Sequence, residues 1–393
     1  MNKLWNINTP QNFWKCQPSH DESLWEKAIH NAKPILGFSS PSDSMDMLNA
    51  KILGEEQFGD GHWTMSLPKK IYYDLKPFLP RPLTKLMRRI YGKGRNISLG
   101  WPIEDRYVRF LWETLRQLLI LSGEERIYFR NFWPANYTYA FVLTHDIETE
   151  KGQAQVRKIV ELESEYGFHS SFNFIPERYE LDRKLIQDLQ DKGFEVGIHG
   201  LKHDGKLFSS KRIFDQRVVK INQYLKEYNS VGFRAPLTHR NPYWMQSLRI
   251  EYDLSFFDTD PFEPMPGGTM SIWPFMIGAF VELPYTLPQD YTLIEVLNDK
   301  SPKVWLEKVE FIARHFGMVL LNSHPDYLLN KDNWDVYASF LREMKYRGGC
   351  WHALPKEAAV WWRDRLYENP LCSQDEPATL SASMLGDELL ISR

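Results

Sequence analysis

Cysteine is scarce in this sequence. Only Cys16, Cys350 and Cys372 occur among 393 residues, and no two of them form a CxxC pair. So few and so widely spaced thiols exclude a disulfide framework and a cysteine-based zinc knuckle. Long apolar runs are also missing, both at the N-terminus, where a secretory signal would lie, and at the length that a membrane span requires. We therefore expect a cytoplasmic protein.

A large excess of charge of either sign is missing as well. The formal net charge is −3, so the overall charge does not draw the chain to nucleic acid, and we expect no such partner. Apolar residues, by contrast, make up 43% of the chain, and aromatic residues 14%. At this length that content is enough for a substantial buried core, which excludes disorder for most of the chain.

The character of the chain changes near Asn131. Before it, the sequence is rich in Trp, Pro and basic residues and has no regular pattern. After it, short apolar runs alternate with segments whose apolar residues recur at helical spacing. This alternation is typical of a parallel sheet that closes, fully or in part, into a barrel. We expect strands at 139–143, 171–175, 194–198, 231–233, 252–256, 280–283, 318–321 and 350–354.

These patterns divide the chain into three parts. Residues 1–135 are predicted to form a mainly helical or irregular extension, rich in Trp and basic residues, that packs on the barrel. Residues 136–368 are predicted to form the barrel domain, and the polar residues 369–393 a C-terminal tail. Because active sites of such barrels lie at the carboxyl ends of the strands, polar residues at those ends are the first candidates for function.

Two carboxylates follow the first predicted strand, in the motif Thr144-His145-Asp146-Ile147-Glu148. If the backbone stays extended, Asp146 and Glu148 point the same way, because side chains alternate along a strand. One carboxylate could then bind a metal ion while the other accepts a proton from water. The alternative is that Asp146 caps a helix that begins near Thr149 and that Glu148 is solvated.

A pair of histidines, His199 and His203, follows the strand predicted at 194–198. Their spacing suits two ligands on one turn, and imidazole suits zinc and related metals. A lone histidine here would more often be a hydrogen-bonded core or surface residue, but a pair beside a carboxylate motif favours a metal site. His169 and His239 have no evident partner, and we interpret them as surface residues or as residues that support the site.

Two more polar residues end strands. Arg234 could hold a carboxylate in a bidentate pair, orient Asp146 and lower its pKa, although a plain structural salt bridge fits the sequence equally well. His324 precedes Pro325, which restricts its backbone to an extended conformation. An imidazole fixed there could protonate a departing amine. The alternative is that His324 only caps the sheet.

The order of these motifs over residues 139–328 resembles the polysaccharide deacetylase family, also called the NodB-homology family or carbohydrate esterase family 4. His199 and His203 resemble its H-x-x-x-H motif, Arg234 its R-x-P motif, and His324 its late histidine. The resemblance implies an α/β fold with a distorted (β/α) barrel. It also implies a hydrolase that removes an N-acetyl or other N-acyl group from an amino sugar.

The first motif departs from the family pattern T-F-D-D, which supplies an aspartate base and an aspartate metal ligand. Here Asp146 aligns with the base, His145 with the phenylalanine and Ile147 with the ligand, and isoleucine cannot bind a metal. Branches with D-x-D or D-x-E place the second carboxylate one residue later, which makes Glu148 the third ligand, although the reverse assignment of the two carboxylates stays open. The resemblance therefore implies a divalent ion, zinc before cobalt, nickel or manganese. It assigns metal ligation to Glu148, His199 and His203, and catalysis to Asp146 as base, Arg234 as its orienting partner and His324 as general acid.

The departure at Ile147 leaves two other functions open. One is a hydrolase of another linear amide or of a cyclic ureide on the same fold, acting without a metal. The other is a catalytically silent sugar-binding protein. The segment 257–269, rich in Pro and Gly, is predicted to be a loop. It could contact sugar hydroxyls through Asp258, Asp260 or Glu263, or serve as a rigid cover.

One stretch of the N-terminal extension bears on the partner. Residues 69–95 contain nine Lys or Arg and a single acidic residue, interleaved with apolar side chains. Such a stretch can lie on an anionic membrane surface, and it can equally be a solvated helix pair packed on the barrel. We therefore expect an N-acetylated glycan or a lipid-linked amino sugar as substrate, and a location in the cytoplasm or at the inner face of the membrane.

Overall fold

The computed structural model describes residues 4–17, 19–40, 42–59, 62–64, 98–265, 267–367 and 379–392. The basic stretch 69–95 lies outside these ranges, so its membrane contact stays a prediction. None of the described helices combines the length and the apolar composition that a membrane span needs.

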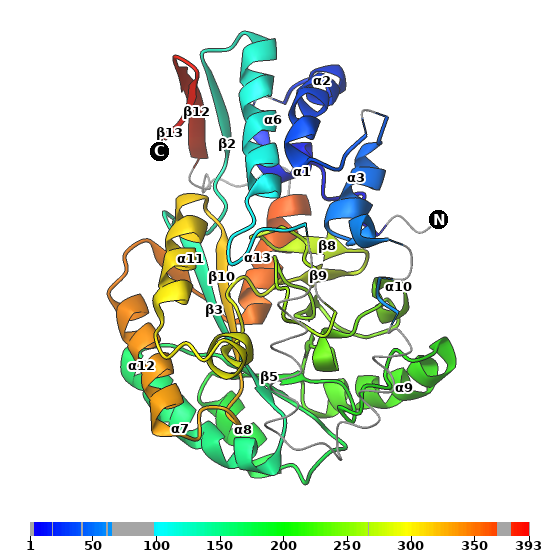
Figure 1. Ribbon diagram of the computed structural model, residues 1–393, viewed down its shortest axis with the longest axis vertical. Helices are drawn as coiled ribbons and strands as arrows, with labels where there is room; N and C mark the ends of the chain where they lie inside the picture. Colours follow the sequence, from blue (N-terminus) through cyan, green and yellow to red (C-terminus); the bar gives the residue numbers. More distant parts are fainter. Residues whose placement is uncertain are drawn as a thin grey trace.

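A curled, mostly parallel sheet forms the centre of the molecule (Figure 1). It has nine strands in the order β10-β3-β4-β5-β6-β7-β9-β8, and β11 pairs with the start of β3. Only β8 and β9 pair antiparallel. This sheet confirms the predicted α/β fold with a distorted barrel. Its strands are β3 (Tyr139–Ile147), β4 (Ser171–Phe174), β5 (Glu195–Ile198), β6 (Gly232–Phe233), β7 (Tyr252–Asp253), β8 (Phe275–Ile277), β9 (Phe280–Glu282), β10 (Met318–Ser323) and β11 (Cys350–His352).

Helices between the strands cover the outside of this sheet. Helix α7 illustrates why they form: Thr149 caps it by accepting a hydrogen bond from Gly152 N at 3.3 Å, and Val156 and Ile159 share its buried face. The helices are α7 (Glu150–Tyr166), α8 (Arg183–Asp191), α9 (Lys211–Glu227), η4 (Pro236–Thr238), α10 (Pro242–Met245), η5 (Tyr291–Val296), α11 (Lys303–Arg314), α12 (Lys331–Lys345) and α13 (Pro355–Tyr367).

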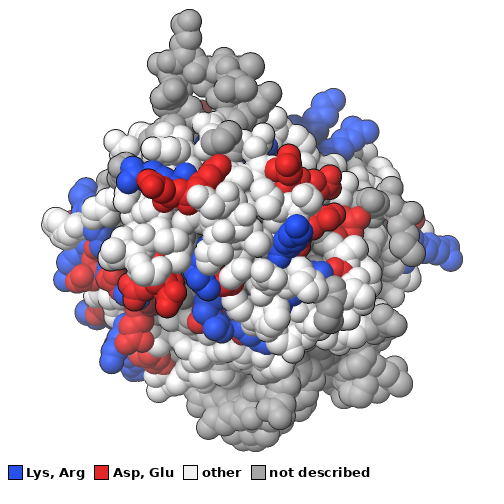
Figure 2. Space-filling model, turned by 90° about the horizontal axis from the view of Figure 1, so that it is seen from above, with Lys and Arg blue, Asp and Glu red and all other residues white. Residues whose placement is uncertain are grey.

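The N-terminal extension lies at the end of the molecule away from α7 and α8 (Figure 1). Aromatic rings join it to the barrel, because Phe13 packs on Trp273 at 4.9 Å and on Phe132 at 5.2 Å. In Figure 2, which looks at the molecule from above this end, acidic and basic side chains of the described residues lie interspersed. Its elements are α1 (Pro10–Trp14), β1 (Cys16–Gln17), α2 (Glu22–Ala32), η1 (Lys33–Leu36), α3 (Met45–Ile52), η2 (Glu56–Phe58), α6 (Arg106–Ser122) and β2 (Arg126–Arg130).

The end of the chain is not an unstructured tail. Strands β12 (Thr379–Leu385) and β13 (Glu388–Ser392) form a hairpin, and β12 adds antiparallel to β2 in a second sheet of order β1-β2-β12-β13. Leu380 and Ala382 alternate inward and are buried, which is the two-residue period of a strand. The prediction of a polar tail overlooked this period. The boundaries at 135 and 368 stay predictions.

Two buried carboxyl groups, Asp253 and Glu282, stand directly opposite each other in the register of β7 and β9. Burial raises the pKa of both above their ordinary values, and the charge of Asp253 raises that of Glu282 further. The folded protein therefore binds protons here more tightly than the unfolded chain. The resulting stabilisation is fully present below the ordinary carboxyl pKa and is lost as the pH rises through the raised values.

We expect Glu282→Gln to raise the free energy of unfolding at pH 8 by on the order of 1 kcal/mol, because a neutral amide needs no proton to sit beside Asp253. Near pH 4 the variant and the wild type are expected to be equally stable. Urea unfolding at the two pH values measures this difference, with Glu161→Gln, at an exposed position of α7, as the control. A loss of stability at both pH values would contradict the prediction.

Candidate metal centre and active site

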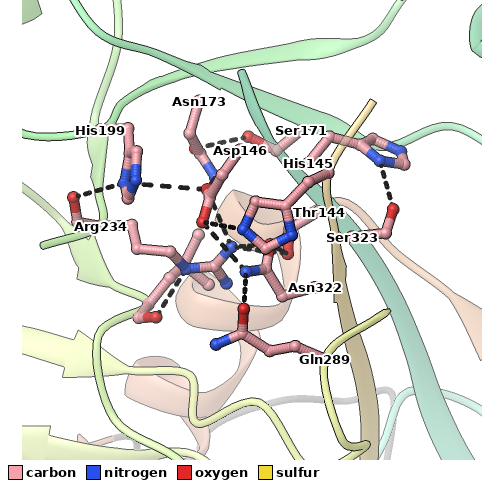
Figure 3. Close-up of polar contacts among 12 residues, drawn as sticks. Thr144, His145, Asp146, Ser171, Asn173, His199, Arg234, Gln289, Asn322 and Ser323 are labelled. Carbon is pink, nitrogen blue, oxygen red and sulfur yellow. Dashed lines mark hydrogen bonds and ion pairs between the residues drawn. The ribbon is translucent and has the colours of Figure 1, made fainter. Parts of the chain in front are cut away.

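The carboxyl ends of four parallel strands bring the six predicted site residues together. Asp146 lies near the end of β3, and His199, Arg234 and His324 directly follow β5, β6 and β10. Glu148 comes one residue after β3, and His203 lies in the turn after β5. Figure 3 shows Asp146 at the centre of polar contacts from the surrounding strands. This convergence is what the barrel geometry predicts for polar strand ends.

Glu148, His199 and His203 form a compact donor cluster. One potential ligand atom from each lies within 4.8 Å of the other two. His203 Nε2 is 2.9 Å from Glu148 Oε1, and the two imidazole rings are 5.1 Å apart. His203 has a left-handed backbone (φ 53°), which residues other than glycine rarely adopt and which is frequent at functional turns.

The chemistry of these donors fits a divalent cation. His199 Nδ1 contacts the Arg234 carbonyl at 3.2 Å, and because a carbonyl only accepts, Nδ1 carries the proton and Nε2 keeps its lone pair. Burial lowers the pKa of His199 to about 4, so the ring is neutral. His203 Nε2 is buried and makes no hydrogen bond within the described part of the chain. Burial opposes ionisation of Glu148, but the nearby His203 holds its pKa well below the ordinary value.

Asp146 is held by hydrogen-bond donors on both oxygens. Asn173 Nδ2 and a terminal nitrogen of Arg234 reach Oδ1 at 3.0 and 3.2 Å, and Asn322 Nδ2 reaches Oδ2 at 3.0 Å. Burial would raise the pKa of Asp146, but the charge of Arg234, followed by those of His199 and His324, holds it below its usual value. Asp146 is therefore a fixed carboxylate beside the donor cluster. It does not cap helix α7, because Thr149 does.

Arg234 reaches Asp146 through one nitrogen, so the predicted bidentate pair is wrong. Its Nε donates to the Leu254 carbonyl at 2.8 Å, which leaves a single terminal nitrogen for Asp146, for the Asn322 side-chain oxygen and for Thr144 Oγ1. The guanidinium is 1% exposed. A buried charge at this place keeps Asp146 ionised.

His324 is paired with Asp290, which the sequence did not suggest. Its Nδ1 lies 2.7 Å from Asp290 Oδ1, and its backbone N–H donates to Asp290 Oδ2 at 2.7 Å. Burial lowers the pKa of His324, but the Asp290 charge and hydrogen bond raise it to about 10. The ring is thus protonated at neutral pH, with Nε2 facing Asp146 Oδ2 at 3.9 Å. This geometry suits a proton donor better than a residue that only caps the sheet.

Three further residues that sequence reasoning missed support the site. Asn173 stands opposite Asp146 in the register of β3 and β4, and Asn322 lies on β10 two residues before His324, on the same face. Asp326 accepts the backbone N–H of Glu148 at 3.1 Å and so fixes the end of the motif. A Cβ at position 152 would lie 2.2 Å from Asp326, so glycine is needed there.

His145 points away from Asp146 (Figure 3). Its ring bridges Ser323 Oγ at 2.8 Å and Glu163 Oε1 at 2.7 Å, and all three residues are fully buried. His145 therefore ties β3 to β10 and α7. Of the remaining histidines, His169 packs on Phe194 at 4.8 Å, and His239 is buried.

The loop 257–269 is a rigid cover rather than a surface for sugar hydroxyls. Asp258 pairs with Lys308 at 2.6 Å, Asp260 accepts a hydrogen bond from Phe262 N at 2.7 Å, and Glu263 accepts one from Gln289 at 2.7 Å. All three acids are buried. The N-terminal extension holds the loop as well, since Glu55 accepts from Gly268 N at 3.0 Å.

Comparisons with known proteins were made for the family, for curated sequences and for solved structures. No family model and no curated protein matches the chain. A solved protein assigned as a polysaccharide deacetylase, from Mycobacterium smegmatis, superposes with a TM-score of 0.50 at 17% identity, over 63% of this chain and 98% of that chain. The chain has the polysaccharide deacetylase fold.

Two other solved structures with this fold were found. A protein assigned as a polysaccharide deacetylase from Pseudomonas aeruginosa has a TM-score of 0.49 and 13% identity, over 61% of this chain and 96% of that chain. The allantoinase PuuE has a TM-score of 0.48 and 12% identity, over 60% and 93%. At such low identity the polysaccharide deacetylase fold leaves the reaction to be argued from the site.

Proposed function

We propose that the protein is a metal-dependent hydrolase that removes an N-acetyl or other N-acyl group from an amino sugar. The observation that carries the proposal is the donor cluster Glu148, His199 and His203, within 4.8 Å, beside the carboxylate of Asp146. The donor set of two imidazoles and one carboxylate suits zinc before cobalt, nickel or manganese. When bound, such an ion supplies an acidified water and a Lewis acid for the acyl oxygen.

Asp146 would accept the proton of the attacking water. Because Arg234 and the neighbouring histidines hold its pKa below the usual value, Asp146 stays ionised throughout the neutral range. A carboxylate this weakly basic can deprotonate only a water that is already acidified. The base and the cation site must therefore act together, and their adjacency, with His199 Nδ1 3.9 Å from Asp146 Oδ1, supports that coupling.

His324 would complete the reaction. Water adds to the acyl carbon, the carbon–nitrogen bond breaks, and Nε2 of the protonated ring gives its proton to the leaving nitrogen. Asp290 holds Nδ1 of His324 and stabilises the charged ring beforehand. The products are acetate, or the corresponding acid, and a free amino sugar.

The substrate class follows from the resemblance and the fold. We propose an N-acetylated glycan or a lipid-linked amino sugar, in cell-surface polysaccharide or lipid-linked glycan synthesis. A cytoplasmic location, peripheral contact of segment 69–95 with an anionic membrane, and the three-part division at 135 and 368 belong to the same proposal.

Acetate release from a panel of N-acetylated oligosaccharides and lipid-linked amino sugars tests this function. We expect release by the protein as purified, loss of release after treatment with a chelator, and recovery when Zn²⁺ is returned. Activity that survives complete metal removal, or ammonia release from a ureide in place of acetate release, would overturn the proposal. Glycan binding without any hydrolysis would point to a sugar-binding protein.

A further inference from the structure

Asp146 ends a chain of hydrogen bonds that leads away from the donor cluster. Asn322 Nδ2 lies 3.0 Å from Asp146 Oδ2 and 3.2 Å from Gln289 Oε1. Gln289 Nε2 donates to Glu263 Oε1 at 2.7 Å, and Glu263 Oε2 accepts from Thr238 Oγ1 at 3.0 Å. All of these residues are buried, and Figure 3 shows the links from Asp146 through Asn322 to Gln289.

The donors and acceptors of this chain agree in one direction only. An ionised carboxylate only accepts, so the Gln289 amide nitrogen faces Glu263 and its oxygen faces Asn322. The Asn322 nitrogen then faces Asp146, and its oxygen faces Arg234 and Thr144. Turning over either amide would set like groups against each other in a buried site, which is costly.

We propose that Gln289, held by Glu263, is a positioning residue for the reaction: it fixes the Asn322 amide that anchors the second oxygen of Asp146. The inference rests on the proposed role of Asp146 as base. Neither Gln289 nor Glu263 contacts the donor cluster, and each acts through its neighbour. Hydrogen-bond partners one step removed from a reacting group commonly change activity without abolishing binding.

The exchange of the two side chains is the decisive test. Gln289→Glu alone places two carboxyl groups at the present 2.7 Å contact and is expected to lower kcat by about 10–100-fold while KM changes little. The double variant Glu263→Gln with Gln289→Glu restores every hydrogen bond in the same order. It is expected to recover most of the lost kcat. Gln289→Ala, which cuts the chain, is expected to lower kcat by about 10-fold.

A matched control separates positioning from general destabilisation. Gln153→Glu adds the same charge at another buried glutamine, on α7, and is expected to change thermal stability without changing kcat. Wild-type kcat in Gln289→Glu and Gln289→Ala would overturn the inference. So would a folded double variant with no more activity than Gln289→Glu. If Gln289→Glu does not fold, Gln289→Ala and the double variant still decide.

The side-chain amide resonances of Asn322 give a readout that does not depend on activity. They are expected to shift in Gln289→Ala and to return to near their wild-type position in the double exchange. A wild type that hydrolyses nothing in the substrate panel would count against the proposed function and leave this measurement standing. Unchanged Asn322 resonances in Gln289→Ala would count against the inference alone.

Discussion

Replacing Asp146 by asparagine is expected to lower kcat/KM for acetate release by about 10²–10⁴-fold. The amide keeps the size of the side chain but cannot accept the proton of the attacking water. Steady-state kinetics on the best substrate of the panel, at saturating Zn²⁺, measures the effect. Metal content is expected to stay at the wild-type level, because the donor cluster consists of Glu148, His199 and His203.

The asparagine variant also breaks a buried ion pair with Arg234, which can cost about 3–5 kcal/mol of stability. Asp258→Asn is a suitable control, because it breaks another buried pair, with Lys308, that lies outside the proposed reaction. Both variants are expected to be less stable, but only Asp146→Asn is expected to lose activity. A folded Asp146→Asn protein within threefold of wild-type kcat/KM would show that another group is the base.

Replacing His199 by alanine is expected to lower kcat/KM by roughly 10³-fold or more, because an ion held by two remaining ligands is bound weakly and polarises the acyl group poorly. The loss is expected to match that of the chelated wild type under the same conditions. His30→Ala, at an exposed position of α2, controls for the removal of an imidazole. Retention of near wild-type activity in His199→Ala would argue for the metal-independent alternative.

The fold and the placement of the candidate site could largely be predicted from the sequence. Apolar runs located most of the strands, because strands buried on both faces are continuously apolar. The polar motif at Asp146 concealed that β3 runs on to Ile147. Strand β8 was missed because its three residues, Phe275–Ile277, carry too short a pattern.

The partners of the site residues could not be predicted in the same way. Asn173 meets Asp146 through the register of two strands, and Asp290 reaches His324 from a loop 34 positions away in sequence. Gln289 and Glu263 approach Asn322 from separate loops. Such contacts depend on how loops close over the sheet, and local residue patterns carry no signal for them. The bidentate geometry expected for Arg234 failed for a related reason, since the Leu254 carbonyl that occupies its Nε comes from the next strand end.

The metal content of the purified protein tests the central claim most directly. Equilibrium dialysis against Zn²⁺ followed by elemental analysis is expected to find a single tightly held ion per chain in the wild type and in His30→Ala, and none in His199→Ala. A wild type that holds no metal while it releases acetate, or a His199→Ala protein that holds as much zinc as the wild type, would contradict the account.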